Sequence, residues 1–235
     1  MTTLVEIRPA GDSAVVVELG TEIDPTLNAR VIAIAAQLRR ERIEGVRDVV
    51  SSYAAVTVYF DPVRTNFEAL TSAITRHVTS PMPEPTPTLV PLEVPVCYGG
   101  VYGPDLNTVA DYSGCSADDV IQMHAEVTYR VYLLGFVPGF AYLGRVNDRI
   151  AMPRRETPRL SVAAGTVGIA GCQTGIYPLT TPGGWQLIGR TATCPFDPAR
   201  DEPLLFTVGD SVRFVPIDEK AFRQAIGKSA TGGVT

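Results

Sequence analysis

The hydrophobic positions of the first eighty residues follow two different periods. Period two over four short runs predicts strands, and spacings of three and four over two longer runs predict amphipathic helices. The first helix is expected to begin after an Asp24 cap with Pro25 at its first position. A Thr65-x-x-Glu68 capping box is expected to open the second helix. The predicted order is ββαββα, with strands at residues 4–7, 14–19, 46–52 and 55–60.

A proline-rich stretch follows, in which every second residue from Pro81 to Pro87 is proline. Such a stretch can neither continue a helix nor donate to a strand ladder, so it is expected to run extended and stiff. We therefore predict a domain boundary here. The expected organisation is an N-terminal α/β domain at residues 1–80, a linker at 81–91, a second domain at 92–226 and a flexible tail at 227–235.

Beyond this linker, the apolar runs are short and are separated by glycine and proline. A strand is predicted at residues 92–97 and a short helix at 104–112, and the Ser116-x-x-Asp119 capping box predicts another helix that runs to about Val127. Many short strands with frequent turn signals are typical of a closed barrel or a sandwich. The whole chain is therefore predicted to be α+β, with further strands at residues 130–134, 161–163, 167–170, 185–191 and 211–215.

Composition excludes several classes of protein. The 20 basic and 25 acidic residues give a net charge of −5, which argues against a nucleic-acid partner. No apolar run approaches the ~18 residues of a membrane span, and the first residues do not resemble a signal peptide. We expect a cytoplasmic protein with no membrane partner. The four cysteines lack metal-ligand or disulfide-framework spacing, so we expect buried thiols and no metal site.

Glycine, proline and aromatic residues concentrate between residues 135 and 190. Glycine lets a backbone approach a ligand closely, and aromatic rings such as Phe140 and Tyr142 can form apolar walls. The alternative is a barrel corner whose aromatic rings, Phe136 and Phe140 among them, fill the core. Gln173 lies in a glycine-punctuated strand pair and can either read an amide edge or make a structural turn contact.

The charge of this stretch is opposite to that of the whole chain. Residues 145–190 contain six arginines and two acids, so the local sum is 6 − 2 = +4. Guanidinium groups hold carboxylates and phosphates in a bidentate geometry, which predicts an anionic ligand. The chain prefers arginine throughout, with eighteen arginines and two lysines, and this preference explains part of the clustering.

His124 is the one histidine that we consider for proton transfer. It shares the inward face of a predicted helix with Val120 and Val127, so a buried structural histidine is the alternative.

Four long motifs resemble the KipI / PxpB family, also called allophanate hydrolase subunit 1 or the carboxyltransferase C/D domain. A shorter motif, GDSVRFVPI at residues 209–217, closes the chain as family members usually close. The resemblance covers nearly the whole chain, and Cys172 departs from it because we expect glycine there. The four motifs are YRVYLLGFVPGFAYLG (129–144), MPRRETPR (152–159), GCQTGIYP (171–178) and PGGWQLIGRT (182–191).

The resemblance implies a fold, an activity and partners. The fold is a small N-terminal α/β domain followed by a cyclophilin-like β-barrel. The activity is that of one subunit of an ATP-dependent 5-oxoprolinase, which hydrolyses the lactam of 5-oxo-L-proline to L-glutamate. The expected partners are a PxpC-like and a PxpA-like subunit, without which the chain is inactive. ATP, with Mg²⁺, is expected to be held by the assembled complex. The alternatives are a KipI-like inhibitor of a sensor histidine kinase and a domain for carboxyl transfer to urea or allophanate.

The resemblance also implies site roles. Opening a lactam requires a site that holds anions and an amide edge, and the candidate residues divide between these tasks. Arg154, Arg155 and Arg159 suit the anions, and Gln173 and Tyr177 suit the amide edge. Trp185 suits a flat ring, as do the aromatic walls Phe140 and Tyr142. The predicted catalytic residues are His124, Gln173 and Tyr177.

Overall fold

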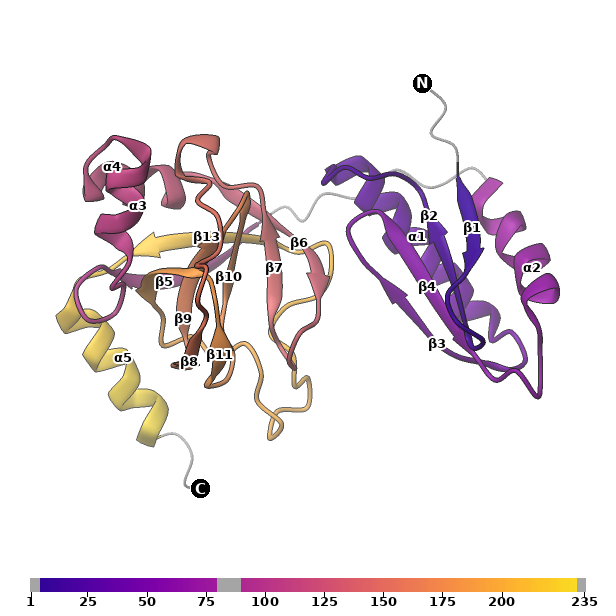
Figure 1. Cartoon of the computed structure of the whole chain (residues 1–235). Coiled ribbons are helices and arrows are strands. Elements are labelled where there is room, and N and C mark those ends of the chain that lie inside the picture. The colour runs from indigo at the N-terminus through magenta and orange to yellow at the C-terminus, as the bar shows by residue number, and fades with distance from the viewer. Residues whose placement is uncertain (1–4, 80–89, 232–235) are drawn as a thin grey trace. The chain divides into compact units, whose positions relative to one another are not determined.

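The protein is described by a computed structural model that covers residues 5–79 and 90–231. The chain divides into two compact units, Met1–Pro87 and Thr88–Thr235 (Figure 1). Of the linker predicted at residues 81–91, residues 81–89 lie outside the described part of the chain. None of the helices in the described ranges is both long and apolar enough to span a membrane.

The first unit is a four-stranded antiparallel sheet with two helices, which confirms the predicted ββαββα order. The strand order in the sheet is β1-β2-β4-β3, and α1 and α2 pack against it. The elements are β1 (Glu6–Pro9), β2 (Ala14–Glu18), α1 (Pro25–Glu41), β3 (Val46–Ser51), β4 (Ala55–Phe60) and α2 (Phe67–Thr79).

Alternation along the strands builds the core of this unit. Val15 and Val17 on β2 and Val56 and Val58 on β4 are fully buried, and they pack in one cluster with the inward residues of both helices. Tyr59, one position out of phase, is exposed on the other face. The period of two therefore places one face of the sheet against the helices.

Both helix starts in this unit are capped by a side chain. Asp24 accepts a hydrogen bond of 2.7 Å from the Leu27 N–H, as predicted, and Pro25 is at the first helical position. The predicted Thr65 cap of α2 is wrong, because the Asn66 carboxamide oxygen accepts from the Ala69 N–H at 2.9 Å. The Thr65 N–H, which a capping box would offer to the Glu68 carboxylate, donates to the Asp61 carbonyl at 3.0 Å. The helix begins one residue later than predicted.

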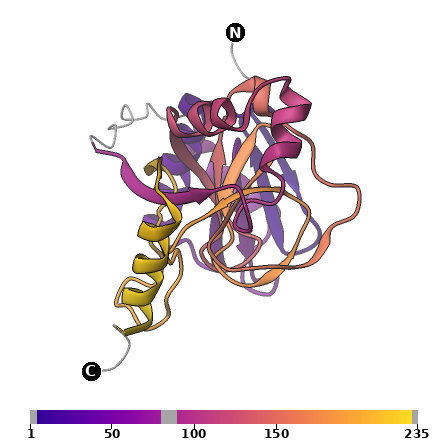
Figure 2. The ribbon, with the colours of Figure 1, turned by 90° about the vertical axis from the view of Figure 1, so that its left-hand side faces the viewer.

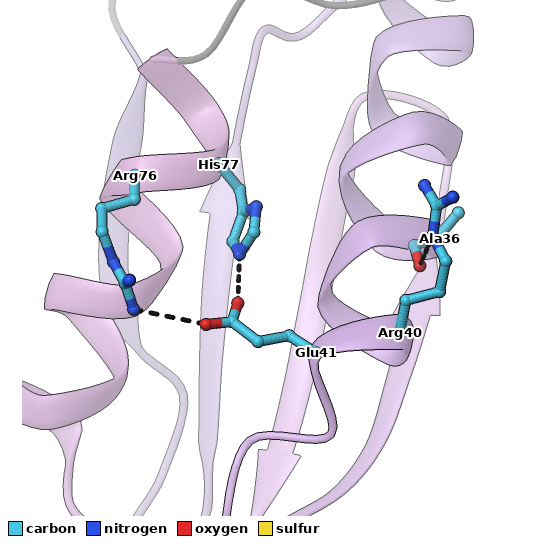
Figure 3. Close-up of polar contacts among 5 residues, drawn as sticks. All are labelled: Ala36, Arg40, Glu41, Arg76 and His77. Atoms are coloured by element: carbon cyan, nitrogen blue, oxygen red, sulfur yellow. Dashed lines mark hydrogen bonds and ion pairs between the residues drawn. The ribbon is translucent and has the colours of Figure 1, made fainter.

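An acidic side chain links the ends of α1 and α2 (Figure 3). The Glu41 carboxylate accepts a hydrogen bond of 3.3 Å from the Arg76 guanidinium and pairs with His77 Nε2 through its other oxygen. Arg40, beside Glu41, donates to the Ala36 carbonyl at 3.3 Å instead. Both basic side chains lie in the last turn of α2, where positive charge interacts favourably with the negative end of the helix dipole.

The second unit contains a closed barrel of seven strands, which confirms the predicted barrel fold. The strand order is β10-β7-β6-β13-β5-β12-β9 (Figure 1), and β8 and β11 form a separate two-stranded sheet. The strands are β5 (Leu92–Tyr98), β6 (Thr128–Leu134), β7 (Ala141–Gly144), β8 (Arg159–Val162), β9 (Thr166–Ala170), β10 (Gln173–Ile176), β11 (Thr181–Gly183), β12 (Gln186–Arg190) and β13 (Ser211–Pro216).

Three helices accompany the barrel. α3 (Leu106–Ser113) contacts β12, and α4 (Ala117–Ala125) contacts β13. The predicted capping box opens α4, since the Ser116 hydroxyl accepts from the Asp119 N–H and the Asp119 carboxylate accepts from the Ser116 N–H.

The chain after β13 forms a helix that was not predicted from the sequence. α5 (Glu219–Thr231) projects from the barrel in yellow in Figure 2 and includes residues 227–231 of the predicted tail. The fully buried Phe222 anchors this helix. Its ring meets the Tyr102 ring edge to face, with 4.7 Å between the ring centroids. Residues 232–235 lie outside the described part of the chain.

Candidate functional site

Four aromatic rings from three separate segments form a cluster on the second unit. Phe140 contributes its ring from the turn before β7, and it lies 4.8 Å from the Tyr142 ring and 5.3 Å from both the Tyr177 and Trp185 rings, measured between centroids. Most of these pairs meet edge to face, a favourable arrangement for aromatic rings. The cluster brings together aromatic residues of three of the motifs.

This cluster is separate from the barrel interior. On β10, the fully buried Thr174 contacts the interior His124, whereas a side chain at the next position, Gly175, would lie 3.2 Å from Phe140 and Trp185. Successive positions of a strand face opposite sides of a sheet, so β10 is a wall between the interior and the aromatic cluster. Glycine at position 175 lets the rings lie directly on that wall.

The rings form one side of a cavity of about 220 Å³, which we call the aromatic pocket. Arg154, Pro158 and residues 182–184 complete its lining together with Phe136. A side chain at Gly183 would lie 2.3 Å from the Tyr177 hydroxyl, so glycine is required there for the strand to approach. Phe136 also lines the cavity; it has a φ of 70° and is 59% exposed.

Arg154 is the cation of the aromatic pocket. Its guanidinium carbon lies 5.9 Å from the Trp185 ring centroid, within the range of a cation–π contact. Among the residues that the structure describes, no carboxylate lies within ion-pair distance of it. Arg154 can therefore pair with an anionic ligand.

Two tyrosine hydroxyls complete the polar groups of the pocket. Burial raises the pKa of Tyr142 and of Tyr177 above its ordinary value. The Arg154 charge partly opposes this at Tyr142, and a hydrogen bond from the Trp185 backbone followed by the Arg154 charge opposes it at Tyr177. Both hydroxyls are thus protonated at neutral pH and can donate a hydrogen bond to a ligand oxygen.

The other two predicted arginines have a carboxylate partner. The Arg159 guanidinium donates to Asp105 Oδ1 at 2.6 Å, and the Arg155 guanidinium lies 3.6 Å from the same oxygen. Asp105 is 4% exposed, and its second oxygen accepts from the Leu187 N–H at 2.6 Å. Asp105 was not among the residues predicted from the sequence, because its partners lie about fifty residues away.

His124 lies inside the barrel, and the structure does not bring it to the aromatic pocket. The Thr174 hydroxyl donates to the Gly168 carbonyl at 3.0 Å, so it accepts from His124 Nε2–H at 2.8 Å. The Tyr98 hydroxyl is 2.8 Å from His124 Nδ1 and donates to it. Both ring nitrogens are satisfied by a neutral imidazole, and complete burial lowers the pKa of His124 to about 3.

Gln173 is half-buried on β10, where its backbone pairs with Gly144 and Ala170. It is outside the cavity lining. The structure thus assembles Phe140, Tyr142, Arg154, Tyr177 and Trp185 around one cavity, and it places His124, Gln173, Arg155 and Arg159 elsewhere.

Comparison with known proteins shows the family. The profile of the family described as "Carboxyltransferase domain, subdomain C and D" matches residues 5–206. The chain belongs to this family. The resemblance that the four motifs indicated is thereby confirmed. The B subunit of 5-oxoprolinase from Bacillus subtilis (strain 168) is similar, with 39% identity over 94% of this chain and 97% of that protein.

Solved structures share the fold of the chain. The crystal structure of TTHA0988 superposes with a TM-score of 0.76 at 35% identity, over 91% of this chain. The chain spans only 40% of the TTHA0988 chain. The Kluyveromyces lactis urea amidolyase superposes with a TM-score of 0.81 at 24% identity over 98% of this chain and 16% of that one, which shows a common fold.

Proposed function

We propose that this chain is the B subunit of an ATP-dependent 5-oxoprolinase complex and that its aromatic pocket binds 5-oxo-L-proline. The observation that carries this proposal is the similarity to the Bacillus subtilis 5-oxoprolinase protein over nearly the full length of both chains. Function does not follow from fold alone, so the proposal also depends on how well the pocket suits the substrate.

The aromatic pocket suits a small, flat ring with a single carboxylate. Its volume of about 220 Å³ lies below the ~300–1,000 Å³ of pockets for drug-sized ligands. The rings of Phe140 and Trp185 can enclose the five-membered lactam, and Arg154 can pair with its carboxylate. The hydroxyls of Tyr142 and Tyr177 can donate to the lactam oxygen. Gln173 and His124 have no part in this set of contacts.

The pocket does not suit ATP. A triphosphate needs several donors or a metal ion, whereas Arg154 is the one cationic side chain of the lining. In residues 5–79 and 90–231, no group of three or more His, Cys, Asp or Glu side chains is placed to hold a metal ion. We therefore propose that ATP and Mg²⁺ bind to other subunits of the complex.

The chain is proposed to be inactive alone. The pocket lining contains no carboxylate, thiol or imidazole that could act as a general base or a nucleophile. The pocket can therefore bind and orient the lactam, and the reacting groups must come from a PxpC-like or a PxpA-like partner. A bound lactam at the rim near Phe136 would be accessible to such a partner.

Reconstitution tests the proposal. We expect ATP hydrolysis that depends on 5-oxo-L-proline when the chain is combined with both partner subunits, and none with the chain alone. Arg154→Met should raise KM for 5-oxo-L-proline by about tenfold or more, because the substrate carboxylate loses its charged partner. Arg149→Met is the matched control, since Arg149 is exposed and outside the pocket. An unchanged KM in Arg154→Met would refute the assigned pocket.

Carboxyl transfer to urea or allophanate is the second candidate, and the carboxyltransferase domain family to which the chain belongs favours it. The same preparation can be supplied with a biotinylated carrier and with urea or allophanate. Turnover with these reagents, and none with 5-oxo-L-proline and ATP, would replace the first proposal by the second. Binding to a sensor histidine kinase without turnover of any of these substrates would favour the inhibitor instead.

A further inference from the structure

The segment that carries Arg154 has no regular secondary structure. Residues 151–158 connect a 3-10 helix at Asp148–Ile150 to β8 and form neither helix nor strand. A segment without the hydrogen bonds of a helix or a strand is positioned by its contacts with the rest of the fold. The place of Arg154 in the pocket therefore depends on those contacts.

Hydrogen bonds to backbone groups hold the segment on each side of Arg154. The Gln186 side chain donates to the Pro153 carbonyl at 2.9 Å, and the Arg155 N–H donates to the Gly184 carbonyl at 2.8 Å. Gly184 and Gln186 flank Trp185, the ring over which the Arg154 guanidinium lies. These contacts join the residues on either side of Arg154 to the residues on either side of Trp185.

Asp105 provides a charged attachment at the end of the segment, through Arg159 at the start of β8 and Arg155 within the segment. Its Oδ1 holds Arg159 at 2.6 Å, and its Oδ2 accepts from the Leu187 N–H at 2.6 Å. The Asp105 N–H also donates to the Leu187 carbonyl at 2.9 Å. The buried carboxylate thus links the segment to the strand that begins directly after Trp185.

Asp105 also determines how much positive charge is available at this site. Arg155 and Arg159 both lie near its Oδ1, whereas Arg154 has no carboxylate partner among the described residues. A buried carboxylate that loses its charge leaves its guanidinium partners uncompensated. Without Asp105, these two arginines would be able to compete with Arg154 for an anionic ligand or to displace its segment.

We propose that Asp105 is a positioning residue for substrate binding. It holds the Arg154 segment against β12 and neutralises the neighbouring arginines, so that Arg154 alone presents its charge to the pocket. This inference rests on the proposed function, because the bound group is taken to be the substrate carboxylate. Asp105 is 4% exposed and outside the cavity lining, so it acts through Arg159 and not by contact with the substrate.

The test uses the reconstituted complex with 5-oxo-L-proline and ATP. Asp105→Asn keeps the size of the side chain and an oxygen for the Leu187 N–H, but it loses the charge that holds Arg159. We expect KM for 5-oxo-L-proline to rise about tenfold, while kcat at saturation changes by less than about twofold. Asp148→Asn is the matched control, since it removes an exposed carboxylate that pairs with Arg145. That control should leave KM unchanged.

A double-mutant cycle separates positioning from a general loss of stability. Arg159→Met should raise KM by a similar factor, and the double variant should be no worse than either single variant, because both act through one contact. Additive effects on KM, or a fall in kcat with KM unchanged, would overturn the inference. If Asp105→Asn does not assemble, Arg159→Met alone decides, and an unchanged KM in that variant would also overturn it.

The result is distinguishable from a failure of the proposed function. If Arg154→Met raises KM and Asp105→Asn does not, the pocket assignment stands and the positioning role is refuted. If Arg154→Met leaves KM unchanged, the assigned substrate contact fails, and the positioning role fails with it.

Discussion

The barrel unit is expected to lose stability as the pH falls, because of His124. Burial without a countercharge lowers the pKa of this imidazole from its ordinary 6.5 to about 3 in the folded state. Between these two values the unfolded chain binds a proton that the folded chain excludes. Stability is therefore complete above the unfolded pKa of 6.5, and it decreases as the pH falls from there towards 3.

The size of this effect follows from the difference between the two pKa values. Each pH unit within the window changes the free energy of unfolding by up to about 1.4 kcal/mol. At a pH of about 5, the loss amounts to about 2 kcal/mol relative to neutral pH, a large share of the ~5–15 kcal/mol that stabilises an ordinary domain. The Tyr98 and Thr174 contacts cannot offset this loss, since a charged ring cannot accept the Tyr98 proton.

Tryptophan fluorescence provides the assay, because Trp185 is the chain's single tryptophan and belongs to the barrel unit. Urea unfolding curves at a series of pH values are compared between the wild-type chain and His124→Gln. The glutamine side chain does not titrate, so the free energy of unfolding of the variant should depend less on pH below neutrality. Near neutral pH, the variant should be less stable than the wild type. His77→Gln, in the other unit, should match the wild type. Parallel pH dependences in wild type and His124→Gln would refute the reasoning.

Three further predictions concern caps, packing and ion pairs. Asp24→Ala should reduce the free energy of unfolding of the first unit by about 1 kcal/mol, measured by circular dichroism in urea, and an unchanged midpoint would contradict the capping role. Gly175→Ala should shift the Trp185 emission and weaken 5-oxo-L-proline binding, since the added carbon would lie 2.8 Å from the Ala141 carbonyl oxygen and 3.2 Å from the Trp185 ring; an unchanged spectrum and affinity would contradict it. Glu41→Gln should cost less than about 1 kcal/mol, because its ion pairs are partly solvated, and a loss well above that in the same urea assay would contradict this interpretation.

Local signals were sufficient to predict the first unit. Apolar periodicity predicted its element order, and Asp24 followed by Pro25 marked the start of α1 correctly. The start of α2 was missed by one residue, because Thr65 and Asn66 are both good caps and the preceding turn decides between them. Sequence propensity cannot rank two neighbouring caps whose difference depends on tertiary contacts.

In the second unit, the strands rich in branched apolar residues were predicted, whereas β7, β11 and α5 were not. β7 is only four residues long and has no period-two pattern of branched apolar residues, so its strand conformation comes from pairing with β6 and β10. Such pairing involves residues far apart in sequence, and a local pattern carries little information about it.

The site was predicted in part for the same reason. The density of aromatic residues and arginine located the aromatic pocket, including Arg154 and Trp185. The pattern could not indicate which arginines have partners, because Asp105 precedes Arg159 by 54 positions. Nor could it indicate that the helix bearing His124 directs the imidazole into the barrel, since an inward face predicts burial but not what lies behind it.

The closure of the barrel has a consequence for how this chain is synthesised. β13 pairs in parallel with β5 from Val212 opposite Leu92 to Pro216 opposite Val96, and it also pairs with β6. A ribosome therefore completes the first unit long before it supplies the strand that joins β5 to β6. Until then both strands present unpaired edges, which are sites of aggregation. Translation that ends before residue 211 is expected to leave an open sheet that chaperones must hold or proteases remove.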